Sequence, residues 1–394
     1  MDINITDKIR YIGVDDTDID LFESQYVVPN GISYNSYLIL DEKVAIMDTV
    51  DYRKSSEWWS NITEALEERT PDYLIVQHVE PDHAGCIGKV AERYPQIQVI
   101  TSARAAQMLG QFFRYPPLLE RITVVKEGDT LSLGRHTLQF TMAPMVHWPE
   151  VMVAYDQTDR VLFSADAFGT FGVLNDNIID TSDEKAWPDE ARRYYYNICG
   201  KYGQSVQTLL KKATAFDIQC ICPLHGPILT ENLTHYIGLY DKWSRYEAES
   251  EGVLIAYASI HGHTAAAADT LGHILHLKGV TEVKLIDLCR SDISTAVAEA
   301  FRMKHMILAA SSYDGGLFTP MHEFLHRIQI KGYKNRRVGI VENGSWAPSA
   351  GRIMKGILSE MKDIELVEPM VTLHSTLEPT NMPAMEALAE AMVN

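Results

Sequence analysis

The second half of the chain alternates short apolar β-type runs with stretches of helical pattern, and this alternation restricts the fold more than any other feature of the sequence. The β-type runs lie at 253–259, 283–288, 305–311, 336–343 and 364–373. Strands that are joined by helices of this length form a parallel sheet with helices on both faces. We therefore predict an α/β domain with a five-stranded parallel sheet over residues 251–394.

The first half, residues 1–250, has short β-type runs joined by turns, and fewer helices. The β-type runs lie at 33–50, which has the pattern of a hairpin, and at 72–78, 97–102, 122–144, 151–156 and 160–166. Helical patterns lie at 53–69, 103–113 and 190–213. An αβ sandwich around a mostly β core accounts for this set of elements. The formal net charge of −18 lies mostly before residue 252, and this step in charge supports a domain boundary near residue 250.

Composition and charge argue against several classes of protein. Hydrophobic residues make up 46% and charged residues 22% of the 394 residues, as is typical of a globular protein with two domains. The negative charge repels nucleic acids and anionic membranes, so we expect neither as a partner. No apolar run approaches the roughly 20 residues that span a bilayer, and the amino terminus lacks a signal-peptide pattern.

The cysteines point to the compartment. The chain has five cysteines and no C-x-x-C pair. This pattern indicates a reducing compartment, and it argues against a structural zinc site or a fused rubredoxin-type iron centre. We expect a cytoplasmic protein.

The stretch QHVEPDHAGC, residues 77–86, places two histidines and two carboxylates directly after an apolar β-type run. These residues are His78, Glu80, Asp82 and His83, and three further candidates that follow β-type runs are His147, Asp166 and His225. Buried carboxylates beside imidazoles need a cation to offset their charge. Seven such ligands suffice for two metal ions that share one carboxylate. The sequence therefore predicts a dinuclear metal site.

Three loops of the second half resemble the flavin-binding loops of flavodoxins. They follow the first, third and fourth strands of the predicted sheet, at the edge where open α/β sheets bind ligands. The residues that they offer are Ser259, Gly262, His263, Thr264, Ser311, Ser312, Tyr313, Asp314, Gly315, Gly316, Asn343, Gly344, Ser345, Trp346 and Ala347. The first loop opens a helix whose backbone N–H groups can hold a phosphate without a basic side chain, although His261 stands where flavodoxins more often have a small hydroxyl residue. Trp346 offers a face for stacking.

The alternative is that these are ordinary turns between strands and helices. The second half has neither G-x-G-x-x-G nor G-x-x-x-x-G-K-[ST], so the usual dinucleotide and nucleoside triphosphate sites are not indicated. Three such loops at the ends of strands one, three and four favour binding of FMN.

The order of the metal ligands is similar to that in the metallo-β-lactamase superfamily, whose zinc hydrolases carry H-x-H-x-D-H. In this chain Glu80 takes the place of the second histidine, and its oxygen donor adds a negative charge that favours iron over zinc. Together with the flavodoxin-like second half, the chain resembles the flavodiiron proteins along its whole length. The resemblance implies a metallo-β-lactamase-like αββα sandwich at 1–250 and a flavodoxin-like FMN-binding domain at 251–394.

The resemblance also implies roles for the ligands and an activity. One iron would be held by His78, Glu80 and His147, a second by Asp82, His83 and His225, and Asp166 would bridge them. The expected reaction is reduction of dioxygen to water, of nitric oxide to nitrous oxide, or of both, with electrons passing through FMN. A separate donor would supply them: a rubredoxin, a flavin reductase or a reduced deazaflavin coenzyme. A head-to-tail homodimer or a dimer of dimers would place each flavin beside the partner's iron pair.

Two other functions stay open. One is a zinc-dependent hydrolase of the metallo-β-lactamase type with an attached flavodoxin domain, and the other is an electron-transfer flavoprotein without enzymatic activity. The choice between dioxygen and nitric oxide depends on packing around the metals, for which Trp148, Phe168 and the run Tyr194–Tyr196 are candidate walls.

Two motifs are set aside. The pattern H-E-x-x-H at 322–326 is that of zinc proteases, but its histidines lie opposite the apolar face of the predicted helix. The basic run 331–337 is interpreted as a solvated turn rather than a docking site for an acidic electron carrier.

Overall fold

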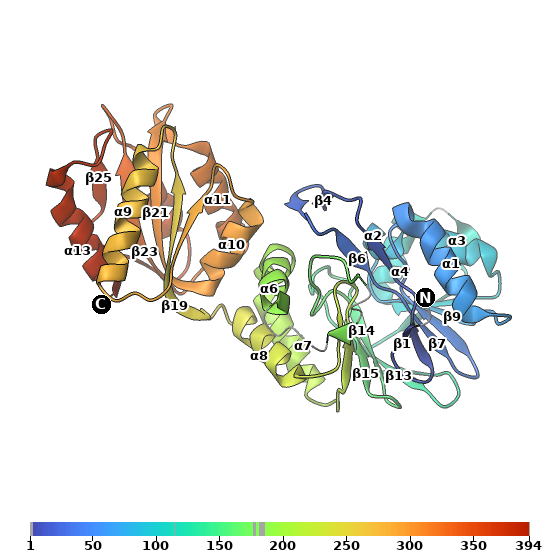
Figure 1. Cartoon of the computed structure of the whole chain (residues 1–394). Helices are drawn as coiled ribbons and strands as arrows, with labels where there is room; N and C mark the ends of the chain where they lie inside the picture. The colour runs from blue at the N-terminus through green and yellow to red at the C-terminus, as the bar shows by residue number, and fades with distance from the viewer. Residues whose placement is uncertain (1–2, 114, 176–178, 181–185, 394) are drawn as a thin grey trace. The chain divides into compact units, whose positions relative to one another are not determined.

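The computed structural model describes residues 3–113, 115–175, 179–180 and 186–393. The chain forms two compact units, Met1–Asp241 and Lys242–Asn394 (Figure 1). The predicted domain boundary, near residue 250, lies a few residues after the division between these two units. It stays a prediction. Within the described ranges, no helix is both long and apolar enough to cross a membrane.

Two seven-stranded sheets form the middle of the first unit, in the orders β1-β2-β7-β8-β9-β10-β11 and β12-β13-β14-β15-β17-β18-β16. The strands of the first sheet are β1 (Ile3–Asn4), β2 (Ile9–Tyr11), β7 (Tyr37–Leu40), β8 (Val44–Met47), β9 (Tyr73–Val76), β10 (Gln98–Ser102) and β11 (Ile122–Val125). Those of the second are β12 (Thr130–Ser132), β13 (Thr137–Met142), β14 (Met152–Asp156), β15 (Val161–Phe163), β16 (Ile179–Asp180), β17 (Cys220–Cys222) and β18 (Ile228–Leu229). Two small ribbons pair β3 (Val14–Asp16) with β6 (Ile32–Tyr34) and β4 (Leu21–Phe22) with β5 (Tyr26–Val27).

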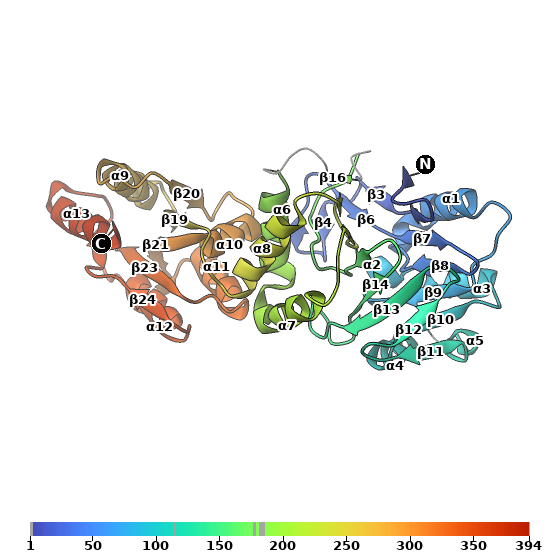
Figure 2. The ribbon, with the colours of Figure 1, turned by 90° about the horizontal axis from the view of Figure 1, so that it is seen from below.

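The inner faces of the two sheets form the core of this unit. Apolar side chains from both sheets, among them Tyr37, Ile75, Phe140 and Phe163, belong to one buried cluster. Helices cover the outer faces, as Figures 1 and 2 show. They are α1 (Ser55–Leu66), α3 (Ile87–Arg93), α4 (Ala103–Phe112) and α5 (Pro116–Leu119) on the side of the first sheet, and α6 (Ala186–Ile198), α7 (Gly203–Ala213) and α8 (Leu233–Ser244) on the side of the second. The short helix α2 (Pro81–Ala84) follows β9 at one end of the sandwich. The predicted αββα sandwich is therefore confirmed.

The prediction of one continuous helix at 190–213 is wrong. The segment divides into α6 and α7, with a 3₁₀ turn at Gly200–Tyr202 between them. The turn begins at Gly200 and is followed by Gly203, and glycine is among the weakest helix formers. A second 3₁₀ turn, Tyr52–Lys54, precedes α1.

The second unit is built on a parallel sheet of order β20-β19-β21-β23-β24. Its strands are β19 (Ser250–Ala258), β20 (Val283–Asp287), β21 (Met303–Tyr313), β23 (Arg336–Asn343) and β24 (Ile364–Leu366), with short β22 (Gly316–Leu317) and β25 (Val371–Leu373) beside them. Helices α9 (His263–Leu277) and α13 (Met382–Val393), which follows a 3₁₀ turn at Pro379–Asn381, cover one face. Helices α10 (Ile293–Arg302), α11 (Thr319–Ile330) and α12 (Ala350–Ser359) cover the other (Figure 2). This strand order is that of the flavodoxin-like fold, as predicted.

The fifth predicted strand, 364–373, is two strands rather than one. Both β24 and β25 pair in parallel with β23, and the residues between them include Pro369. Proline has no backbone N–H to donate to a neighbouring strand, so a single ladder cannot run through this position.

The two motifs that were set aside have structural explanations. On α11 the side chains of Phe324 and Leu325 are buried, whereas His322 and His326 are exposed on the opposite face. In the basic run, Arg336 is buried and donates hydrogen bonds to the carbonyl oxygens of Met303, Tyr246 and Phe301. The prediction of a wholly solvated turn is therefore wrong at Arg336, which ties backbone segments of the second unit together.

Candidate metal centre and flavin pocket

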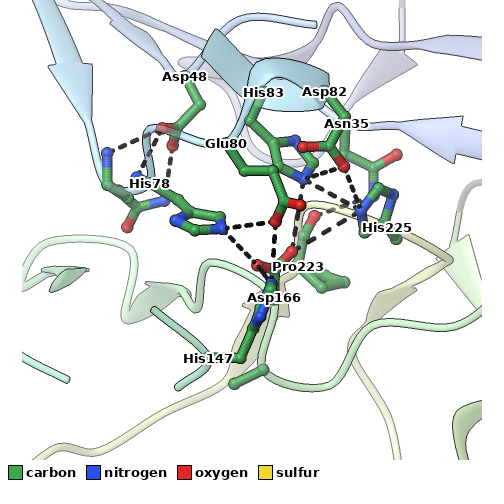
Figure 3. A network of polar contacts seen from close by, with 12 residues as sticks. Asn35, Asp48, His78, Glu80, Asp82, His83, His147, Asp166, Pro223 and His225 are labelled. Carbon is green, nitrogen blue, oxygen red and sulfur yellow. Dashed lines mark hydrogen bonds and ion pairs between the residues drawn. The ribbon is translucent and has the colours of Figure 1, made fainter. Parts of the chain in front are cut away.

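The seven predicted metal ligands come together at one end of the sandwich (Figure 3). They lie in the segments that follow strands β9, β13, β15 and β17, at the ends where these strands leave their sheets. Four of them come from the short segment between β9 and the end of α2. The buried strands thus hold ligands from four distant parts of the sequence in one place.

The first group contains His78, Glu80, His147 and Asp166. The Nε2 atoms of His78 and His147 lie 3.1 and 3.0 Å from Glu80 Oε2. The same two nitrogens lie 3.2 and 3.3 Å from Asp166 Oδ2. Two imidazoles and two carboxylates therefore face a common point.

The second group contains Asp82, His83 and His225. Both imidazole Nε2 atoms lie 3.2 Å from Asp82 Oδ2, and they lie 3.0 Å from each other. The other oxygen of Asp166, Oδ1, lies 3.4 Å from His83 Nε2 and 3.7 Å from His225 Nε2. Asp166 therefore presents one oxygen to each group, which is the arrangement expected of a bridging carboxylate.

These distances fit bound metal ions. Donor atoms that lie about 2.1 Å from one ion are separated from each other by about 3.0 to 3.4 Å in tetrahedral or octahedral geometry. Asp82 Oδ1 and Asp166 Oδ2 are buried and take part in no hydrogen bond. A mixed set of imidazole and carboxylate donors suits iron.

Electrostatics at the site favour a cation. Burial lowers the pKa of His83, but the carboxylates of Asp82 and Asp166 outweigh it and raise this pKa to about 10. Burial opposes the shift at His147 as well, where Asp166 and Glu80 raise the pKa to about 9. Burial raises the pKa of Asp166, and the facing imidazoles nevertheless hold it well below its usual range. Metal ions bound here would replace the protons of these imidazoles.

A second layer of contacts orients the ligands. His78 Nδ1 lies 2.7 Å from Glu150 Oε1, which also accepts a hydrogen bond from the backbone N–H of Val79. His225 Nδ1 lies 2.7 Å from the carbonyl oxygen of Ser33. Such partners hold the proton on Nδ1 and leave Nε2 free to bind a metal. Sequence reasoning missed both, although Glu150 follows His147 closely enough to have been a candidate.

Asp48 fixes the position of the residue that precedes His78 after β9. Its Oδ1 accepts from the backbone N–H of Gln77 at 2.8 Å, and its Oδ2 accepts from Gln77 Nε2 at 2.9 Å. Burial raises the pKa of Asp48 to about 6, and the hydrogen bonds from Gln77 lower it in part. Sequence reasoning missed this residue as well.

The aromatic residues that were predicted as walls have different positions. Trp148 lies edge-on to the ring of His78 at 5.3 Å, and the hydroxyl of Tyr194 donates to Asp166 Oδ1 at 3.1 Å. Phe168 instead stacks on Tyr240 and lines an apolar cavity of about 290 Å³ beneath α7 and α8. Tyr195 packs against that same Tyr240, so only part of the predicted set contacts the metal ligands.

The predicted flavin loops surround a cavity of about 510 Å³ in the second unit. Its lining is Ser259, Ile260, His261, His263, Thr264, Ser311, Ser312, Tyr313, Asp314, Gly315, Asn343, Gly344, Ser345, Trp346, Ala347 and Ser375. This volume is within the range of cofactor sites. The lining has no lysine or arginine, so backbone N–H groups at the start of α9 and nearby hydroxyls are the available phosphate donors. Trp346 is 92% exposed and leaves a face for stacking.

The lining differs from the prediction at a few positions. Gly262 and Gly316 are not part of it: Gly262 has a φ of +90° at the start of α9, and Gly316 pairs with Tyr313 across a tight turn. His261 does line the cavity, and Ser375 joins it from the loop after β25. The fifth strand ends at the same edge as the other three, which was the signal available for Ser375.

The fold and the two sites define a metallo-β-lactamase-like metal domain joined to a flavodoxin-like flavin domain. Residues 32–226 match a family described as ODP family beta lactamase. An uncharacterised protein of Methanocaldococcus jannaschii is 30% identical over 325 residues, which cover 82% of this chain and 81% of that one. The anaerobic nitric oxide reductase flavorubredoxin of Escherichia coli is 28% identical over 89% of this chain and 74% of its own.

A solved structure has the same fold. Rubredoxin oxygen:oxidoreductase from Desulfovibrio gigas matches with a TM-score of 0.94 and 24% identity, covering 100% of this chain and 98% of the other. The chain belongs to the flavodiiron proteins, which are oxidoreductases that carry FMN and a di-iron site. The predicted family, fold class and cofactors are therefore confirmed.

Proposed function

We propose that the protein reduces dioxygen to water, nitric oxide to nitrous oxide, or both. The observation that carries this proposal is the position of Asp166, with one carboxylate oxygen toward each group of metal ligands. In the first group, Glu80 supplies an oxygen donor where zinc hydrolases have a histidine, which favours iron. The relative from Escherichia coli is named a nitric oxide reductase, and this supports nitric oxide as one substrate.

In this proposal, His78, Glu80 and His147 hold one iron. Asp82, His83 and His225 hold the other, and Asp166 bridges the two. When bound, two ferrous ions and one fully reduced FMN supply the four electrons that convert dioxygen into two water molecules.

The protein's own groups position the ligands and exclude water. Glu150 and the Ser33 carbonyl keep the Nε2 atoms of His78 and His225 directed at the metals. The Tyr194 hydroxyl donates to Asp166 Oδ1 and limits how far this carboxylate can turn. Trp148 over His78 and Phe22 over His225 cover these imidazoles with apolar surface, so the ligands stay dry.

For the flavin we propose that the start of α9, with Ser259 and Thr264, holds the phosphate. Asn343 Nδ2 donates to the Thr264 hydroxyl, which also bonds to Ser311, so three loops are connected beneath the phosphate position. Trp346 would stack on the isoalloxazine ring.

Metal analysis and a gas electrode test this function together. We expect about two iron atoms per chain and uptake of dioxygen, nitric oxide or both by chemically reduced protein. Comparing the two gases on one preparation ranks them as substrates. Zinc in place of iron, or iron-loaded protein that consumes neither gas, would contradict the proposal.

We propose further that electrons come from a separate donor of the rubredoxin, flavin reductase or reduced deazaflavin kind, and that the protein works as a head-to-tail dimer or a dimer of dimers. Two variants test the dimer: Asp166→Ala, and a flavin-deficient variant with changes at Ser259, Thr264 and Trp346. Each should be inactive alone, and mixed dimers should regain part of the donor-driven activity. If verified mixed dimers stay inactive while each variant keeps its other cofactor, electron transfer runs within one chain.

A further inference from the structure

A second cluster of metal-ligand side chains lies in the first unit, outside the seven residues already described. It consists of His136, Asp156 and Asp159, whose ligand atoms lie within 4.8 Å of one another. His136 precedes β13, Asp156 ends β14, and Asp159 lies in the turn between β14 and β15. A fourth residue, Asp41, reaches the cluster from the turn between β7 and β8 of the other sheet.

The strand directions place this cluster at the opposite end of both sheets from the iron ligands. Asp159 lies just before β15, whereas Asp166 lies just after it. In the first sheet, Asp41 lies just before β8, which runs parallel to β9, and His78 follows the far end of β9. The cluster therefore cannot share a cation with the proposed iron pair.

The geometry of His136 resembles that of the proposed iron ligand His78. His136 Nδ1 lies 2.9 Å from Asp41 Oδ2, and its Nε2 lies 3.2 Å from Asp159 Oδ2. An imidazole held by a carboxylate at Nδ1, with Nε2 facing further carboxylates, is the usual arrangement of a metal-binding histidine. The backbone N–H of His136 also donates to Asp41 Oδ2 at 2.6 Å, which fixes this pair.

Asp156 gives an independent indication that this cluster binds a ligand. It is completely buried, and its Oδ1 takes part in no hydrogen bond. Its Oδ2 accepts the backbone N–H of Asp159 at 2.8 Å, and the backbone N–H of Thr158 is a second donor close to this carboxylate. A buried carboxylate oxygen without a partner carries a large free-energy cost unless a cation or a donor faces it.

The charge of the cluster is also unbalanced. Across the described part of the chain, no lysine or arginine forms an ion pair with Asp41, Asp156 or Asp159, and Arg135 acts on Asp159 only from beyond ion-pair distance. Three carboxylates thus surround a single imidazole. A divalent cation would balance most of this charge and would supply the partner that Asp156 lacks.

We propose that His136, Asp156 and Asp159 bind a divalent first-row transition-metal ion, with Asp41 orienting the imidazole. One imidazole and two carboxylates suit Mn²⁺, Fe²⁺ or Zn²⁺. Because Asp41 belongs to one sheet and the other three residues to the second, the ion would join the ends of the two sheets. Its role would be structural, and it takes no part in the proposed gas reduction.

The experiment titrates the iron-loaded protein with Mn²⁺ and counts the bound ion by electron paramagnetic resonance. We expect about one Mn²⁺ per chain, an unchanged iron content and a higher melting temperature as the ion is added. In His136→Gln and Asp156→Asn, the bound Mn²⁺ should fall at least tenfold while the iron content stays the same. His273→Ala is the control, because its imidazole pairs with Asp269 on the exposed surface of α9 and its loss should change nothing.

Crystals grown with Mn²⁺ give a readout that does not depend on how the variants fold. An anomalous scattering peak between His136, Asp156 and Asp159 is expected. No peak in the wild-type protein at millimolar Mn²⁺, or equal Mn²⁺ binding by wild type and folded His136→Gln, would overturn the proposal. In that case the cluster is a protonated imidazole held between carboxylates. Since the test needs neither activity nor substrate, its failure leaves the proposed gas reduction untouched.

Discussion

The metal centre and the flavin pocket use opposite strategies to hold a cofactor. In the candidate metal centre every proposed ligand is a side chain, and His78, His83 and His225 are fully or almost fully buried. Neighbouring groups contact Nδ1 of His78 and of His225 and orient these two rings. In the flavin pocket the partners are loop backbone and small hydroxyls, and the largest aromatic, Trp346, is exposed. The first site is assembled by the fold itself, whereas the second presents exposed loops to a large ligand.

This difference has a physical reason. Metal ligands repel one another or lose hydration when they are buried together, so the strands must hold them in place against that cost. A flavin brings its own large apolar surface and phosphate, so it can order the loops that contact it. We therefore expect substitutions at the metal centre to have large effects on metal content and small effects on flavin, and the reverse at the pocket.

The largest effect is expected for Asp166→Ala, because one side chain serves both metal groups. We expect this variant to lose iron and its rate of gas reduction to fall by more than about 100-fold. This loss exceeds the one typical of residues that only orient a metal ligand. The FMN content, read from its visible absorbance, should stay at the wild-type level. Asp217→Ala, at an exposed carboxylate paired with Arg160, is the control. Loss of FMN in Asp166→Ala would contradict the expected independence of the two sites.

Glu80→His tests the choice of metal. The change restores the nitrogen donor that zinc hydrolases have, so we expect less iron, more zinc and loss of gas reduction. Folding should be little affected, because histidine is polar and can also bind a metal. Metal content and a thermal melt measure both outcomes. Two irons with full gas uptake would show that Glu80 is not a ligand.

Glu150→Gln tests whether the buried carboxylate that contacts His78 affects the affinity for iron. Its carboxylate accepts from His78 Nδ1 and from the Val79 N–H, and glutamine keeps the shape but loses the charge. We expect iron affinity to fall by about 10- to 100-fold, measured by competition with a chelator. Glu365→Gln, at an exposed carboxylate that pairs with Arg337, should have no effect. Equal affinity in both variants would mean that the fold alone orients His78.

The smallest effect is expected at the pocket. Trp346→Ala removes one stacking face and should weaken FMN binding by on the order of 1 kcal/mol, or about fivefold. The iron content should not change. Tyr52→Ala removes another exposed aromatic, which lies outside the pocket, and serves as the control. An unchanged flavin dissociation constant in Trp346→Ala would remove this residue from the site.

Much of the fold could be predicted because it follows from local patterns. The alternation of strands and helices after residue 250 leads to a parallel sheet, and the bounds of β23 agree with the predicted run at 336–343. The errors lie where a local pattern continues through a break, as at Gly200 and Pro369. There the preference of one residue overrides the pattern of its neighbours.

The sequence by itself determined the kinds of group that this protein offers: seven metal-ligand side chains at strand ends, with Glu80 as an oxygen donor, and three loops suited to a flavin. Tertiary structure alone decided which donors meet. The hydrogen bond from His225 to the Ser33 carbonyl spans 192 positions. Asp166 can present one oxygen to each group of ligands only because segments that follow four strands converge there. The cluster around His136 is likewise invisible along the chain, since Asp41 comes from another sheet. Side-chain period is a local property of the backbone, whereas contacts between strands of different sheets depend on how the sheets pack.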